Sequence, residues 1–259
     1  MRENKWFKVG KILYLILFLA IEAFIYNLFI LEDFNANVDI DSNLYKYESI
    51  ILVVIFYFLN FIINMIIERI DKDYDKRIRF DGIILGLALL FTLLSDTFLL
   101  HLDNYYEIGV TSFLVVQVLY LFRMFYSLGL NRKRLKITLM IRGCAFILIM
   151  LGLIIFNSFS YLYLITGLYF INLVMNFIDS LIFLISYRGE DRFKSIFVFT
   201  IGLLLFIGCD INVGLSNLIG VGSNIIWIFY LPSQVLISLS GTRLFNMTLG
   251  GKVINERKQ

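Results

Sequence analysis

Two aspartic acids stand inside runs of residues that are otherwise apolar. Asp96 ends the stretch LLFTLLSD, and Asp210 ends the stretch LLLFIGCD. A carboxylate in the hydrocarbon of a bilayer costs about 2.5 to 3.5 kcal/mol on insertion scales, so such groups are rare unless they have a function. If the two acids face one another, repulsion leaves one protonated and one ionised. Such a pair can perform acid-base catalysis.

The elements that position these acids are predicted to be membrane-spanning helices. Of the 259 residues, 59% are hydrophobic and only one is proline, a composition that excludes an ordinary soluble domain. A helix needs roughly 20 apolar residues to cross a bilayer. By this criterion we predict eight spans, at residues 12–31, 49–67, 82–102, 108–129, 137–156, 161–186, 195–214 and 224–244.

The fold expected from these spans is an all-α polytopic membrane bundle. Only two connections, 32–47 and 68–80, are sizeable, so residues 1–259 are predicted to form a single integral membrane domain. The two halves of the chain resemble each other, because each acid is followed by a short loop and then by a span that carries a glutamine. We therefore predict two parallel four-helix repeats, at about 1–130 and 131–259.

The two acids are expected at one level of the membrane. Each lies about 22 Å into its span, counted at ~1.5 Å per residue, which puts both in the outer half of the bilayer. The glutamines of the following spans, Gln117 and Gln234, enter from the outer face to nearly the same depth. The sequence thus predicts a polar cavity, open toward the outer leaflet, that collects Asp96, Asp210 and both glutamines.

Two further acids fall inside predicted spans. Glu22 lies near mid-membrane, where it is either a third member of the site or a partner for Asn27 or another polar side chain. Asp179 lies at about the level of Arg123 and Arg142. A structural ion pair is the favoured interpretation of Asp179.

Lysine and arginine gather at alternate ends of the predicted spans, and this sets the orientation. The N-terminal segment, the loops after the second, fourth and sixth spans, and the C-terminal segment carry them, whereas the other loops have only Lys46. The positive-inside rule therefore predicts a multi-pass protein of the cell membrane with both termini in the cytoplasm. The basic stretch NRKRLK is explained in the same way, so we do not expect nucleic acid as a partner.

Residues that could hold a metal or a cofactor are few. His101 is the only histidine, and no HExxH motif or Cys/His cluster accompanies it. No GxSxG elbow or GxxxxGK phosphate loop is present either. We predict neither a metal nor a cofactor.

Four stretches resemble the sequence pattern of the YhhN-like family of eight-span membrane proteins, which includes the lysoplasmalogenases. They are LLFTLLSD, GVTSFLVVQVLY, LLFIGCD and YLPSQVLISLS. Three positions depart from the family pattern, with Ser95 in place of glycine, Cys209 in place of serine and Gln117 in place of histidine. The positions that match are Asp96, Gly109, Phe113, Tyr120, Asp210, Tyr230, Gln234 and Ser240.

The resemblance implies an intramembrane hydrolase that cleaves the vinyl-ether bond of lysoplasmalogen lipids. Asp96 and Asp210 would be its catalytic pair, since one acid must protonate the alkene and one carboxylate must stabilise the resulting cation and activate water, as in glycosidases. The partner implied is a membrane lipid that resembles a lysophospholipid. The substrate-binding residues would be Gln117, Tyr120, Tyr230, Gln234 and Glu22.

Glutamine at position 117 can orient a headgroup or a water molecule but cannot transfer a proton at neutral pH. If the family needs histidine for turnover, this chain is altered or inactive; if histidine only positions the substrate, glutamine suffices. A noncatalytic lipid-binding protein is therefore one alternative function. A proton-coupled transporter is another, although parallel repeats and a single proline, Pro232, give little sign of the broken helices of such carriers.

Overall fold

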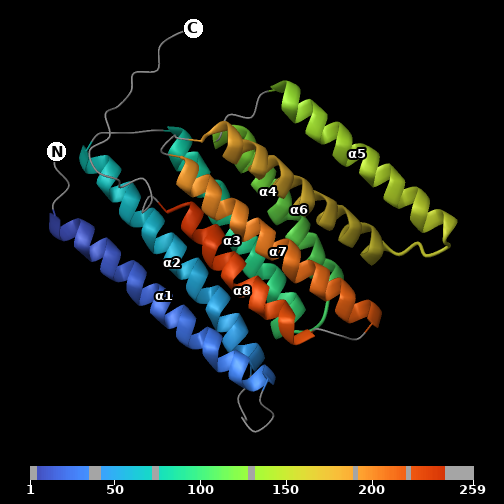
Figure 1. Cartoon of the computed structure of the whole chain (residues 1–259), viewed down its shortest axis with the longest axis horizontal. Helices are drawn as coiled ribbons and strands as arrows, with labels where there is room; N and C mark the ends of the chain where they lie inside the picture. The colour runs from blue at the N-terminus through green and yellow to red at the C-terminus, as the bar shows by residue number, and fades with distance from the viewer. Residues whose placement is uncertain are drawn as a thin grey trace.

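Helices make up almost all of the described chain. The computed structural model describes residues 5–34, 42–71, 76–127, 132–188, 192–219 and 223–242. Figure 1 shows the helices lying side by side as one bundle. In chain order the elements are α1 (Lys5–Phe34), α2 (Ser42–Asp71), α3 (Lys76–Asp96), the π-helical turn η1 (Thr97–His101), α4 (Tyr106–Ser127), α5 (Arg132–Ile155), α6 (Tyr161–Ser186), α7 (Phe193–Ile219) and α8 (Ser223–Ser240).

The helices confirm the predicted all-α polytopic bundle. Seven of the described helices are long and apolar enough to cross a membrane, and the apolar part of α8, Ile225–Ser240, is shorter. A helix satisfies its own backbone hydrogen bonds, which lipid cannot do, so this architecture suits the composition. Most helices extend beyond the predicted spans because the prediction counted only apolar residues. The last predicted span ends at residue 244, and its final two residues lie outside the described part of the chain.

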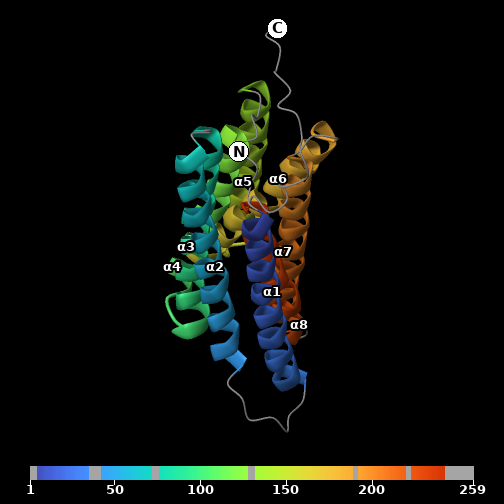
Figure 2. The same cartoon turned by 90° about the vertical axis from the view of Figure 1, so that its left-hand side faces the viewer.

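The helices pack in pairs that recur four helices along the chain. The pairs α1–α2, α2–α3 and α3–α4 correspond to α5–α6, α6–α7 and α7–α8, and the contact of α2 with α8 corresponds to that of α6 with α4. α1 and α5 form the two outer edges of the bundle (Figure 1), and Figure 2 shows α1 and α2 from their side. This pattern supports the predicted four-helix repeats, which remain a prediction.

α7 and α8 approach each other closely at a glycine. A Cβ atom on Gly202 would lie 2.7 Å from Ile237 Cγ1 and 3.2 Å from the backbone oxygen of Ser233. Small residues that let two helix backbones approach closely are a common device for holding membrane helices together. The close packing fixes α7, which carries Asp210, against α8.

Buried and partly buried ion pairs join the helices at the end of the bundle where α3 begins and α4 ends. Arg123 binds Asp81 at 3.0 Å and donates a second hydrogen bond, of 2.9 Å, to the Ser240 hydroxyl. Arg142 lies 3.4 Å from Asp179. The predicted structural ion pair of Asp179 is thus confirmed with Arg142, whereas Arg123 pairs with a different acid.

Candidate functional site

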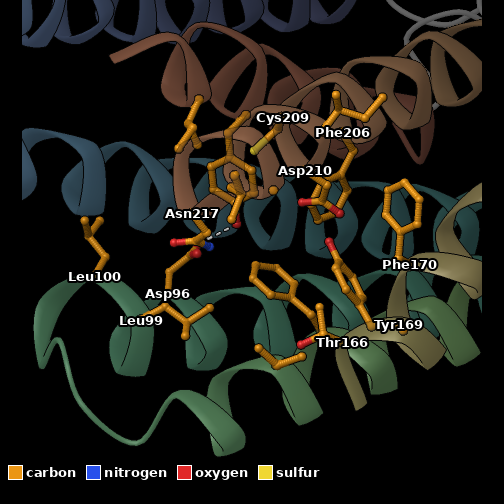
Figure 3. A pocket seen from close by; sticks show the side chains of 18 of the residues that line it. Asp96, Leu99, Leu100, Thr166, Tyr169, Phe170, Phe206, Cys209, Asp210 and Asn217 are labelled. Carbon is orange, nitrogen blue, oxygen red and sulfur yellow. Dashed lines mark hydrogen bonds between the residues drawn. The ribbon is translucent and has the colours of Figure 1, made fainter. Parts of the chain in front are cut away.

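A cavity of about 660 Å³ lies toward the other end of the bundle, where α3 ends and α4 begins. Residues from α3, η1, α4, α6, α7 and α8 line it, and both Asp96 and Asp210 are among them (Figure 3). The two acids therefore meet at one cavity although 114 positions separate them in the chain (210 − 96). Most of the lining side chains are apolar, and none of the described lining residues is Lys, Arg or His.

Asp96 is the last residue of α3 and is only 4% exposed. Its Oδ2 atom accepts a hydrogen bond of 2.7 Å from the Tyr230 hydroxyl on α8. A hydrogen bond to a carboxylate is among the stronger ones in proteins, particularly where water is excluded. The bond ties the acid to a helix from the other half of the chain.

The turn after Asp96 depends on a glycine in α4. The Ser95 hydroxyl donates a hydrogen bond of 2.6 Å to the backbone oxygen of Gly109. A Cβ atom at Gly109 would lie only 2.5 Å from Leu99 Cγ, so α4 and η1 approach more closely than a side chain permits. η1 is a π-helical turn, an irregularity that is frequent at functional sites.

Asp210 lies within α7 and is partly exposed. Its Oδ2 atom is buried and has no hydrogen-bond partner among the described residues. The Tyr169 hydroxyl on α6 points toward the Asp210 carboxyl (Figure 3). These two groups interact, although their geometry falls short of a strict hydrogen bond.

Aromatic rings hold the two tyrosines that approach the acids. The Phe206 ring lies 5.6 Å from the Tyr230 ring and 6.3 Å from the Tyr169 ring, measured between centroids. The Phe113 ring contacts all three, at 5.6 to 6.2 Å. Edge and stacked contacts of this kind each stabilise packing by about 0.5 to 1.5 kcal/mol. The rings make the surroundings of the two acids largely apolar.

Gln117 and Tyr120 do not line the cavity, which corrects the prediction that it collects the glutamines. Gln117 is fully buried between α4 and α6, where its Oε1 atom accepts a hydrogen bond of 3.0 Å from Asn176. Phe113, which lies one turn earlier on α4, occupies the cavity wall instead. Tyr120 packs edge-on against Phe199, 5.3 Å away.

Gln234 and Glu22 also lie outside the cavity wall. Gln234 is buried one turn beyond Tyr230, and its side-chain nitrogen donates a hydrogen bond of 3.3 Å to the neighbouring Ser233 hydroxyl. Glu22 accepts a hydrogen bond of 2.5 Å from Ser49 on α2, so its partner is another polar side chain and not Asn27. None of the described α1 side chains lines the cavity.

Several cavity residues were missed by the sequence analysis. Tyr169, Asn217 and Trp227 line the wall, and Tyr169 points at one of the acids (Figure 3). Nothing in the sequence distinguishes Tyr169 from the other fourteen tyrosines. Within the described residues, no group of three His, Cys, Asp or Glu side chains is placed to hold a metal ion.

The fold and the cavity define a polytopic helical membrane protein with two acids at a buried, largely apolar site. The sequence model of the YhhN family matches residues 44–241, a segment that contains all the lining residues, and the chain belongs to this family. A comparison with curated proteins and another with solved structures gave no match.

Proposed function

We propose that this protein hydrolyses the vinyl-ether bond of a single-chain ether lipid, as lysoplasmalogenases do. The observation that carries the proposal is the presence of Asp96 and Asp210 on the wall of one cavity inside an apolar bundle. Membership of the YhhN family supports the same activity. The cavity volume of about 660 Å³ falls within the range of pockets that enclose one small ligand, which favours a lipid with one chain over a lipid with two.

The reaction needs one proton donor and one carboxylate. A carboxylic acid protonates the alkene carbon that is remote from the ether oxygen, which leaves an oxocarbenium ion. Water then attacks the carbon next to oxygen while the carboxylate accepts a proton from it. The resulting hemiacetal collapses to an aldehyde and an alcohol, so that one water is consumed and the total number of protons on the acids is unchanged.

The contacts of the two acids suggest their roles. The Tyr230 hydroxyl donates a hydrogen bond to Asp96, which stabilises negative charge there, so we assign Asp96 as the carboxylate. Asp210 has an oxygen atom without a partner among the described residues and lines the same cavity, so we assign it as the proton donor. Tyr169, whose hydroxyl faces Asp210, orients this acid.

The position of Gln117 favours an active enzyme over a noncatalytic lipid-binding protein. Gln117 occupies the place of the family histidine, yet its side chain bonds Asn176 in the core and does not reach the cavity wall. The departure from the family pattern therefore leaves the two acids and their tyrosines unchanged. The substrate-binding role predicted for Gln117 is not retained.

The orientation in the membrane is part of the proposal. The distribution of Lys and Arg supports a cell-membrane protein with both termini in the cytoplasm, an arrangement in which the cavity lies in the outer half of the bilayer. Protease or antibody access to tags on the two termini, in intact and in permeabilised cells, tests this arrangement.

The decisive experiment is product analysis with the purified protein. We expect aldehyde release from a lysolipid with a vinyl-ether chain, and none from the matched lysolipids with a saturated ether or an ester chain. Release of fatty acid from the ester alone would contradict the proposal. Lipid binding without any product would support the noncatalytic alternative instead, and proton-coupled solute uptake into vesicles would support a transporter.

A further inference from the structure

The cavity opens sideways between α6 and α7. On α6, Thr166 and Phe170 line the cavity and are also exposed on the outside of the molecule. On α7, Val213 and Asn217 do the same. Residues that belong to both a cavity wall and the surface mark its mouth. The mouth therefore faces the side of the bundle, where lipid chains surround a membrane protein.

A glycine lies in the α7 wall of this mouth. Gly214 comes four residues after Asp210, so the two share one face of the helix, and Asn217 follows on the same face. A Cβ atom on Gly214 would have no neighbouring atom within 4 Å. The space next to Gly214 is thus open. Along α7 it lies between Asp210 and Asn217.

On the opposite wall, on α6, glycine is needed for a different reason. A Cβ atom on Gly167 of α6 would lie 2.8 Å from Ile149 of α5, so close helix packing requires glycine there. No such packing requires glycine at position 214, although glycine within a helix costs about 0.5 to 1 kcal/mol relative to alanine. What glycine provides at position 214 is free volume in the cavity mouth.

We infer that the opening between α6 and α7 is the entrance by which the lipid reaches the acids from the bilayer, and that Gly214 keeps this passage wide enough for it. The occupant is a single-chain amphiphile, an identity that rests on the proposed function. The neutral polar groups of Thr166 and Asn217 at the mouth suit its glycerol hydroxyls, and the aromatic wall at Phe206 suits its chain. Gly214 is then a residue that determines specificity without taking part in the chemistry.

Binding can be measured independently of catalysis, because the cavity contains a tryptophan. Trp227 lines the wall, and the chain has only one other tryptophan, Trp6. In a Trp6→Phe background, a saturated-ether lysolipid with a brominated chain, which lacks the scissile bond, should quench the fluorescence of Trp227 as it enters. Aldehyde release from the matched vinyl-ether lipid is measured in parallel.

The test variants narrow the mouth from each side, and the control adds equal bulk elsewhere. Gly214→Leu and Thr166→Leu should each weaken quenching by roughly tenfold and raise the KM for aldehyde release, with a smaller effect for Gly214→Ala. Gly152→Leu on α5 is the matched control, since a Cβ atom there also has no neighbour within 4 Å and Gly152 does not line the cavity. It should behave as the parent protein, and melting temperatures verify that all variants fold.

The possible outcomes distinguish failure of the proposed entrance from failure of the proposed hydrolysis. If Gly214→Leu and Thr166→Leu, both folded, bind the brominated lipid like the control, the entrance is elsewhere and the inference is overturned, whether or not aldehyde is released. If the parent protein releases no aldehyde from any lipid but quenching is still lost in both variants, the entrance stands and the proposed hydrolysis fails. If Gly214→Leu does not fold, Thr166→Leu and Gly214→Ala decide in the same way.

Discussion

The Tyr230 hydroxyl on α8 donates a hydrogen bond of 2.7 Å to Asp96 at the end of α3. The bond connects the two halves of the chain at the cavity wall, and both residues are less than 5% exposed. Among the described residues, the Oδ2 atom of Asp210 has no such partner. Tyr230 is therefore the group expected to hold the Asp96 carboxylate in place.

Replacement of Tyr230 by phenylalanine removes this bond and little else. A hydrogen bond to a charged group contributes about 1.5 to 3 kcal/mol, so kcat/KM for aldehyde release should fall roughly 10- to 100-fold. Tyr169→Phe is the matched control, because Tyr169 faces the other acid without a strict hydrogen bond. Its effect should be smaller, and equal losses in the two variants would contradict the distinction drawn between the acids.

The catalytic pair itself is tested by asparagine, which preserves the shape of aspartate but cannot exchange a proton. Asp96→Asn and Asp210→Asn should each lower the rate of aldehyde release by roughly 100-fold or more, since general acid-base catalysis contributes about 10² to 10⁴. The melting temperature should change little. The control is Asp103→Asn, an exposed acid that bonds Tyr106 outside the cavity wall, and near-normal turnover in either test variant would rule out the two-acid mechanism.

Much of the bundle and the convergence of the acids could be predicted from the sequence, because lipid imposes a length and a composition on each span. Asp96 and Asp210 were noticed because a charge is conspicuous in apolar sequence. The rotation of each helix could not be predicted in this way. In a helix that is apolar all round, the face toward lipid and the face toward the core look alike.

The misplaced glutamines have a separate cause, because the depth to which the cavity extends along α4 and α8 could not be predicted either. Gln117 and Gln234 were placed at the cavity by depth alone, whereas the structure puts the residues one turn before them, Phe113 and Tyr230, on the wall. Asn176 on α6 bonds Gln117 from the core side, a contact that no spacing in the sequence indicates. Residues four apart share one face of a helix, so the prediction found the correct faces of α4 and α8 but placed the site one helical turn too far from the cavity.

Because Gln117 lies in the core, we predict that replacing it changes the stability of the protein but not its turnover. Gln117→Leu removes the 3.0 Å bond from Asn176, but Asn176 keeps a bond of 2.8 Å to the backbone oxygen of residue 117. Stability should fall by about 1 kcal/mol, as for one neutral hydrogen bond. Turnover per folded molecule should stay close to normal in Gln117→Leu and in Gln117→His. A roughly 100-fold loss of kcat at an unchanged melting temperature would mean that Gln117 takes part in catalysis after all.

The ion pair between α5 and α6 should be essential for attachment of α5. Asp179 accepts a hydrogen bond of 2.8 Å from Thr138 and contacts Arg142, and both charged side chains are less than 10% exposed. Among the described cations, Arg142→Met leaves Asp179 the more distant Arg134, at 3.7 Å, so we expect a loss of stability near the lower end of the 3 to 5 kcal/mol typical of broken buried pairs. Equilibrium unfolding in mixed micelles measures this loss in the free energy of unfolding. Arg142→Met combined with Asp179→Leu should recover most of the loss, and a double variant as unstable as the single one would contradict the argument.

Lys46, which lies near the start of α2, is the one lysine that departs from the charge pattern of the sequence, and its contacts explain why. Its ammonium group lies 2.8 Å from Asp33, so the pair contributes no net charge at that end of the bundle. The same ammonium lies 5.7 Å from the ring centroid of Trp227, a residue of the cavity wall. Lys46 therefore connects Asp33 of α1 to the cavity residue Trp227, although Lys46 itself does not line the cavity.

Lys46→Met should disturb the cavity wall through this link. It leaves the acid of a mostly buried pair uncompensated and removes a cation from the face of Trp227, so we expect a loss of about 3 kcal/mol in stability and a shift of the Trp227 emission maximum in the Trp6→Phe background. Adding Asp33→Asn removes the uncompensated charge and should restore most of the stability, but it cannot restore the cation on the ring. The emission shift should consequently persist in the double variant. An emission maximum equal to that of the parent in both variants would mean that the ammonium does not influence the wall.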